Sequence, residues 1–127
     1  MNLPADLPPP LILTPVAPDA HTVRIALSGD LDHETCDLLL SLVEGQLTDR
    51  PDMVHLHLDC AGLLACDSMG LAALLMVRRR TSGAGVRLHL DHRTLPLDRL
   101  LMLTGTLEHL TGPPAAVRER SEDQTGR

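Results

Sequence analysis

The sequence predicts a single α/β domain, with a mixed sheet of four to five strands and helices packed mainly on one face. The first observation is that strand-like segments alternate along the chain with segments of helical periodicity, which is typical of parallel or mixed sheets. The second is strict apolar and polar alternation within three strand-like segments, which indicates one buried and one wet sheet face. The third is the length of 127 residues, which suits one hydrophobic core.

Two strands are predicted to open the domain as a hairpin. Residues 11–13 form a short apolar strand that suits a sheet edge, because Pro15 lacks an amide donor. Residues 23–27 alternate as a half-buried strand. The same alternation predicts strands over 53–59 and 86–91, and within each of these the even-numbered residues are expected to face the core.

Three helices are predicted between and after these strands. The first covers about 33–48, with Asp32 as its cap and an apolar stripe that faces the core. The second covers about 68–80, and the third about 95–104. A last short strand or helical turn is expected over 106–110.

The second helix is predicted to present two different faces. The face directed at the core consists of Leu71, Leu74 and Leu75. The opposite face consists of Met69, Ala73, Met76 and Arg80. Small or flexible apolar side chains adapt readily to a partner, so we predict a partner-binding surface here, although a second layer of the same domain could also cover it. Arginines 78–80 are predicted to be solvated and matched to the helix dipole.

Composition and charge exclude several classes of function. The chain has no Phe, Tyr or Trp and a formal net charge of −6. It therefore lacks the aromatic platforms and the basic surface that nucleic acids require, and we expect no direct contact with DNA or RNA. The cysteines Cys36, Cys60 and Cys66 show no CxxC spacing, which indicates reduced thiols in the cytoplasm rather than a disulfide framework or a zinc knuckle.

The two ends of the chain are predicted to lie outside the folded domain. Residues 1–10 are rich in proline and carry no basic residue, so we expect a flexible arm rather than a signal peptide. Residues 113–127 are charged and poor in apolar residues, which predicts a frayed or disordered tail after a domain of residues 11–112. No apolar run approaches the length of a membrane span, so we expect no membrane contact.

The junction between the third strand and the second helix carries the functional prediction. An aliphatic run ends at Asp67 and Ser68, where a strand is expected to pass into a helix. A Ser or Asp there can cap the free amides of the helix. The same amides favour a phosphate. Ser68 is therefore both a candidate cap and a candidate phosphorylation site.

Two other kinds of site match parts of the sequence. A serine hydrolase needs Gly-x-Ser-x-Gly at a strand-to-helix turn, and Cys66 stands at the position of the first glycine. Histidines 55, 57 and 89 are expected to share the wet sheet face, where zinc could bind them with Asp59 or Asp91. Paired histidines on a wet sheet face are more often simply solvated, so we predict no metal, no cofactor and no catalysis.

Two segments in this setting resemble the STAS domain, specifically the bacterial anti-sigma factor antagonists. They are residues 29–32, Gly-Asp-Leu-Asp before the first helix, and residues 66–71, Cys-Asp-Ser-Met-Gly-Leu after the strand that contains Leu58 and Asp59. The resemblance covers residues 11–110. It implies the STAS fold, and the family usually has Ser or Thr where this chain has Met69.

The resemblance also implies a phosphorylation switch. In the family, an anti-sigma factor that is itself a serine kinase with a GHKL-type ATP site phosphorylates the residue that corresponds to Ser68. The unphosphorylated antagonist binds this kinase and frees its sigma factor, and a phosphatase resets the phosphorylated form. The partner-binding residues expected from this match and from the helix face are Asp32, Asp67, Met69, Gly70, Ala73, Met76 and Arg80.

The alternative is a STAS module that is never phosphorylated and acts as a scaffold or as a subunit of a signalling or lipid-transport complex. In either case we expect a monomer or a weak homodimer, because the edge strand and the wet sheet face could each support weak self-association.

Overall fold

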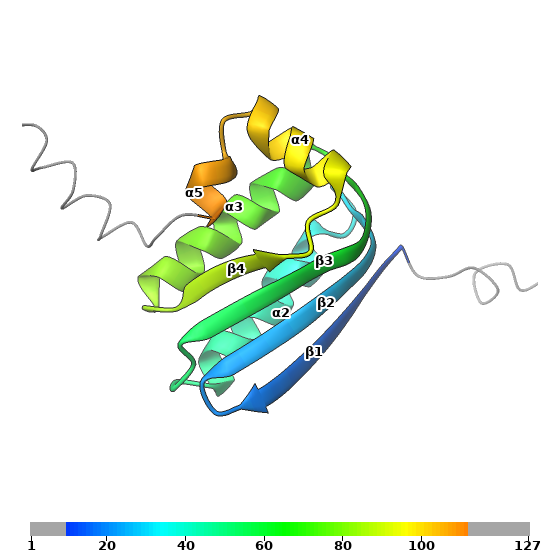
Figure 1. Ribbon diagram of the computed structural model, residues 1–127. Helices are drawn as coiled ribbons and strands as arrows, with labels where there is room; N and C mark the ends of the chain where they lie inside the picture. Colours follow the sequence, from blue (N-terminus) through cyan, green and yellow to red (C-terminus); the bar gives the residue numbers. More distant parts are fainter. Residues whose placement is uncertain (1–9, 112–127) are drawn as a thin grey trace, which may run out of the picture.

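The computed structural model describes residues 10–111, which form four strands and four helices (Figure 1). In chain order the elements are β1 (Leu11–Asp19), β2 (Thr22–Leu31), α2 (Cys36–Asp49), β3 (His55–Cys66), α3 (Ser68–Gly83), β4 (Arg87–Asp91), α4 (Leu95–Leu103) and α5 (Leu107–Thr111). The predicted N-terminal arm, apart from Pro10, and the predicted C-terminal tail lie outside the described residues.

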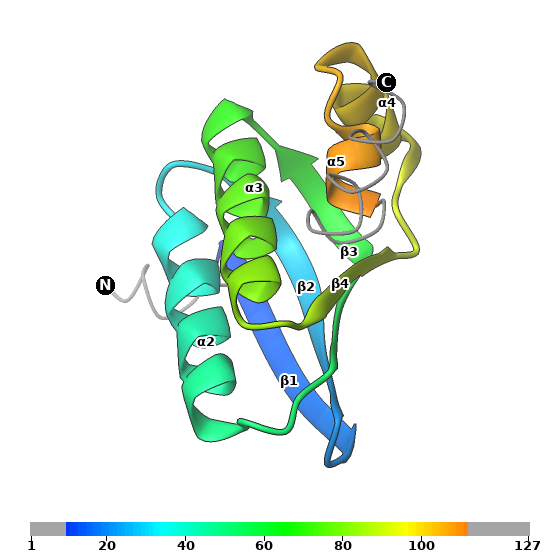
Figure 2. The same cartoon turned by 90° about the vertical axis from the view of Figure 1, so that its left-hand side faces the viewer.

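The four strands form one mixed sheet in the order β1-β2-β3-β4. Strand β1 pairs with β2 in antiparallel orientation, whereas β2 with β3 and β3 with β4 are parallel. Helices α2 and α3 lie side by side across one face of this sheet, and α4 and α5 continue the helical layer beyond the end and edge of β4 (Figures 1 and 2). The predicted mixed sheet with helices mainly on one face is confirmed.

The core lies between the sheet and this helical layer. Ile25 and Leu58 pair across β2 and β3, Leu90 pairs with Leu58 in β4, and all three side chains are buried. The intervening residues His57 and His89 are only partly buried, because they point to the face that carries no helix. Period-two alternation therefore predicted the buried face correctly in the strands.

Three of the four described strands are longer than the sequence predicted, whereas β4 begins one residue later than the predicted strand over 86–91. Strand β1 continues through Pro15 to Asp19, because it forms the sheet edge, where the missing proline amide can be tolerated. Strand β3 continues to Cys66. The alternation predicted for 53–59 is wrong at its start, since Met53 is buried and Val54 is 45% exposed. Both residues precede β3 and do not follow its pleat.

The helices agree with prediction except at their ends. Helix α2 begins at Cys36 rather than near residue 33, because a turn occupies the residues that follow Asp32. Helix α4 begins with Thr94 as its N-cap, whose Oγ1 accepts a hydrogen bond from the Leu97 amide at 3.4 Å. The last predicted element is the helix α5 rather than a strand.

Candidate functional site

The two strand-to-helix junctions of the domain meet at the carboxyl ends of the parallel strands β2 and β3. Leu31, the last residue of β2, pairs with Cys66, the last residue of β3. The Asp67 amide also donates a hydrogen bond to the Leu31 carbonyl at 3.3 Å. The starts of α2 and α3 are therefore neighbours, although 31 positions separate Cys36 from Asp67 in the sequence. Carboxyl ends of such sheets are common sites of recognition.

The start of α3 is capped by Asp67 and not by Ser68. Asp67 has extended backbone angles, and its Oδ1 accepts a hydrogen bond from the Gly70 amide at 2.9 Å. Ser68 is the first residue of the helix and is exposed. Among the described residues its hydroxyl has no hydrogen-bond partner. The interpretation of Ser68 as a cap is wrong, because the residue before it already occupies that position.

Gly70 is required by close packing rather than by surface contact. It is buried, and a Cβ atom added to it would lie 2.2 Å from the Leu31 carbonyl oxygen and 2.9 Å from Cys66 Sγ. Neither distance is tolerated by a real Cβ atom. The glycine thus lets α3 approach the end of β2, which places Ser68 and Met69 beside α2.

The other junction is held by Asp32 and Thr35. Asp32 Oδ1 accepts a hydrogen bond from the Glu34 amide at 2.9 Å. The buried Thr35 hydroxyl donates to the Asp30 carbonyl at 2.8 Å and accepts from the Asp32 amide at 2.9 Å. The prediction that Asp32 caps this helix is wrong: Thr35 is the N-cap residue of α2, and Asp32 stabilises the turn that precedes the helix.

A groove of about 160 Å³ lies between α2 and α3. We call it the α2–α3 groove, and it is lined by Cys36, Asp37, Leu40, Met69, Ala72, Ala73 and Met76. Met69, next to Ser68, is 49% exposed. Ala73 is only 3% exposed, so the prediction that it stands on an open helix face is wrong. Helix α2 supplies the second wall, and Ala73 forms part of the floor.

The arginines at the end of α3 have different surroundings. Arg80 pairs with Glu44 of α2, and both side chains are about half exposed, so this ion pair contributes little stability. It does link the two helices that form the α2–α3 groove. Arg78 is 3% exposed, which contradicts the predicted solvated position, whereas Arg79 is exposed.

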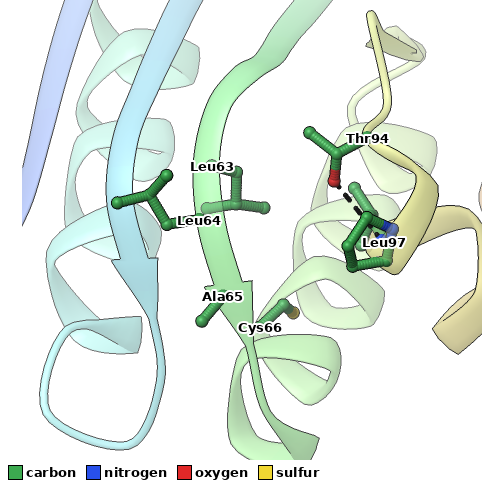
Figure 3. A pocket seen from close by; sticks show the side chains of 7 residues that line it. Leu63, Leu64, Ala65, Cys66, Thr94 and Leu97 are labelled. Atoms are coloured by element: carbon green, nitrogen blue, oxygen red, sulfur yellow. Dashed lines mark hydrogen bonds between the residues drawn. The ribbon is translucent and has the colours of Figure 1, made fainter.

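A smaller hollow of about 40 Å³ lies on the other side of the junction. Figure 3 shows it between the end of β3, with Leu63 and Cys66, and the start of α4, with Thr94 and Leu97. It has room for only a few water molecules. Burial raises the pKa of the Cys66 thiol to about 11, so this thiol is protonated and unreactive at neutral pH.

Three further observations on residues 10–111 concern the alternative chemistries and the membrane. In this part of the chain, no histidine contacts the Ser68 hydroxyl, as a serine hydrolase would require. The same residues contain no group of three or more His, Cys, Asp or Glu side chains placed to hold a metal ion. Nor does any helix among them have the length and apolar character needed to cross a membrane.

These features define a small α/β domain with an exposed serine at a helix start beside an apolar groove. A family model described as "Mlab, STAS domain" matches residues 16–119. The chain therefore belongs to the STAS domain family, as the sequence motifs at residues 29–32 and 66–71 implied. The comparison with curated proteins gave no significant match.

Solved structures agree with this assignment. An anti-sigma factor antagonist from Mycobacterium paratuberculosis is 19% identical, with a TM-score of 0.67 over 80% of this chain and 83% of its own. The Bacillus cell fate determinant SpoIIAA in its phosphorylated form is 17% identical, with a TM-score of 0.63 over 87% and 99%. A sulfate transporter family protein from Wolinella succinogenes is 19% identical, with a TM-score of 0.62 over 78% of each chain. At such identities the likeness shows a shared fold.

Some parts of this site were missed by sequence reasoning. The wall that α2 contributes, with Asp37 and Leu40, was not predicted, because both residues were assigned from the periodicity of their own helix alone. The sequence did not distinguish Asp67 from Ser68 as the cap, because Asp and Ser are about equally good N-cap residues. The residue at which the helix begins decides between them, and the structure begins α3 at Ser68.

Proposed function

We propose that this protein is an anti-sigma factor antagonist that binds a GHKL-type anti-sigma kinase when unphosphorylated and is released after phosphorylation of Ser68. It would thereby regulate transcription that depends on a sigma factor, as a cytoplasmic binding module without catalysis of its own. A phosphatase would restore the binding form. The STAS family assignment and the likeness to antagonist structures support this role.

The single observation that carries the proposal is the state of the Ser68 hydroxyl. It is exposed, without a hydrogen-bond partner in residues 10–111, and adjacent to Met69 on the rim of the α2–α3 groove. A kinase could therefore reach it without unfolding the helix. Because Asp67 provides the cap, esterification of Ser68 removes no bond that the fold needs.

The proposed switch has a simple electrostatic basis. A phosphate on Ser68 adds about −1.5 to −2 charges next to the Asp67 carboxylate and at the edge of an apolar surface. A partner docked over Met69 and the groove would have to desolvate this charge. A loss of ~1.4 kcal/mol weakens binding tenfold, and one unit charge facing another of the same sign at 4 Å costs ~1 to 4 kcal/mol.

We propose that the partner contacts Met69, Met76 and the neighbouring α2–α3 groove. Asp32 and Asp67 would form the acidic rim of this surface. The buried residues Gly70 and Ala73 would act by shaping this surface, and Arg80 by holding α2 against α3. A partner that matches the switch presents apolar side chains to the groove and a carboxylate near Ser68, which the phosphate would repel. This assignment predicts that changes at Met69 affect binding more than changes at Arg80.

The test uses purified protein, candidate GHKL kinases and ATP, with mass spectrometry to locate the phosphate. We expect the phosphate on Ser68. The Ser68→Ala variant should bind the kinase tightly and accept no phosphate. The Ser68→Asp variant should bind the kinase about tenfold more weakly or worse. Ser41→Asp is a matched control, because Ser41 is exposed on α2 outside the groove. Equal binding by Ser68→Ala and Ser68→Asp would contradict the switch.

Two findings favour a second candidate, a scaffold or subunit of a signalling or lipid-transport complex in which Ser68 stays unmodified. The matching family model is described by the name Mlab rather than as an antagonist, and a sulfate transporter family protein has the same fold. This candidate predicts no phosphate on Ser68 with any such kinase. It also predicts stable co-purification with a larger assembly whether residue 68 is Ser or Asp.

A further inference from the structure

The sheet face that carries no helix bears three histidines from two adjacent strands. His55 and His57 are two residues apart on β3 and therefore project to the same side. His89 of β4 lies directly opposite His57 in the parallel pairing. This face is turned toward the viewer in Figure 1, with the helices behind it. The three rings gather near the start of β3, whereas Ser68 follows its end.

Two of these rings direct nitrogen atoms at each other. His55 Nδ1 lies 3.0 Å from His89 Nε2, so the two imidazoles share one proton in a hydrogen bond. A tetrahedral zinc ion held 2.0–2.1 Å from each nitrogen would separate them by about 3.3 Å. To exchange the shared proton for an ion, the rings would need to separate by a few tenths of an ångström and to turn so that both lone pairs converge on the ion. Both side chains are only partly buried, so an ion can reach them from solvent.

The third ring supports this pair without joining it. His57 Nδ1 donates a hydrogen bond to Asp91 Oδ2 at 2.8 Å, and its ring stacks on that of His89 with centroids 4.2 Å apart and an angle of 10° between planes. Lone pairs lie in the ring plane, so two parallel stacked rings cannot both direct one at the same ion. His57 therefore holds the His89 ring in place.

We propose that His55 and His89 form a binding site for a divalent transition-metal ion of the zinc, copper or nickel class. Neutral imidazole suits these ions, whereas calcium and magnesium prefer oxygen ligands. No group of three or more ligating side chains is preformed within residues 10–111. The ion is therefore held by two imidazoles, and water occupies its remaining coordination positions. The site is independent of the proposed phosphorylation switch.

The experiment is a titration of the full-length protein with Zn²⁺ alone, followed by calorimetry and by NMR of the histidine ring nitrogens. We expect saturable binding of one ion per chain, with the largest shifts at Nδ1 of His55 and Nε2 of His89. His55→Gln and His89→Gln should each weaken binding by at least about tenfold, because each removes one of two linked contacts.

Two variants serve as controls. His33→Gln changes an exposed histidine on the turn before α2 and should leave zinc affinity unchanged. His57→Gln should weaken zinc binding less than His55→Gln, because His57 only positions a ligand. Unsaturable binding of zinc would overturn the proposal. So would unchanged affinity in His55→Gln with its circular dichroism spectrum preserved, or ring-nitrogen shifts that are largest at other histidines.

Discussion

The two strand-to-helix junctions use similar residues for different purposes. Each has an aspartate after a parallel strand and a hydroxyl side chain near the start of the helix. At the start of α2 the Thr35 hydroxyl is buried and makes two hydrogen bonds to the backbone. At the start of α3 the aspartate caps the helix, and the Ser68 hydroxyl is exposed without a partner in the described part of the chain.

This difference separates a structural hydroxyl from one that is available for chemistry. A buried hydroxyl with two backbone bonds cannot be esterified without loss of those bonds. An exposed one beside a capped helix start can be modified while the fold stays intact. The first junction therefore serves stability, the second is the proposed site of regulation, and four predictions test this difference.

The largest expected effect is on the packing that brings the junctions together. Gly70→Ala should lower the free energy of unfolding by about 3 kcal/mol, because the new Cβ would meet the Leu31 carbonyl oxygen at 2.2 Å. Gly45→Ala is the matched control, since Gly45 lies within α2 with nothing within 4 Å of an added Cβ. It should stabilise the protein by up to about 1 kcal/mol. Urea unfolding measures both variants.

The next prediction contrasts the two hydroxyls directly. Thr35→Val should lower the free energy of unfolding by about 2 kcal/mol, because it leaves the Asp30 carbonyl and the Asp32 amide without their partner. Ser68→Ala should change the same quantity by less than about 0.5 kcal/mol. Urea unfolding of both proteins provides the measurement. Similar losses in the two variants would remove the distinction between the junctions.

A smaller effect is expected from the cap of α3. Asp67→Ala should lower the free energy of unfolding by about 1 kcal/mol, since the Gly70 amide loses its acceptor. Asp67→Asn retains an acceptor and should cost less. Thermal unfolding followed by circular dichroism compares the two. A fully stable Asp67→Ala protein would mean that Ser68 can take over the cap, and its hydroxyl would then not be free.

The smallest effect concerns the thiol next to the second junction. Because burial raises the pKa of Cys66 to about 11, its thiolate is scarce at pH 7.5. We expect alkylation of Cys66 to be roughly a hundredfold slower than that of free cysteine, whose pKa is about 8.5. Iodoacetamide labelling with peptide mass spectrometry gives the rate. Its rise with pH should continue beyond pH 9, and a plateau near pH 8 would contradict the buried environment.

Much of the fold could be predicted from local patterns. The alternation in β2 and β4 identified the buried face, and Pro15 identified an edge strand. The STAS motif located the junction at Ser68. It also identified the family, and the match to the family model confirms that assignment. Helix periodicity failed at Ala73 and Arg78, because it states which side a residue faces and not which neighbouring element covers that side.

By itself, the sequence determined the order of strands and helices, the one-sided sheet and the position of the serine at a helix start. These features depend on residues a few positions apart, whose spacing sets the side on which each apolar group lies. Only the tertiary structure decided that the Ser68 hydroxyl has no partner within residues 10–111 while Thr35 is bonded. It also decided that Ala73 forms the floor of a groove and that His55 meets His89. Each of these depends on which parallel strands and helices become neighbours, and that choice is made by packing of the whole core.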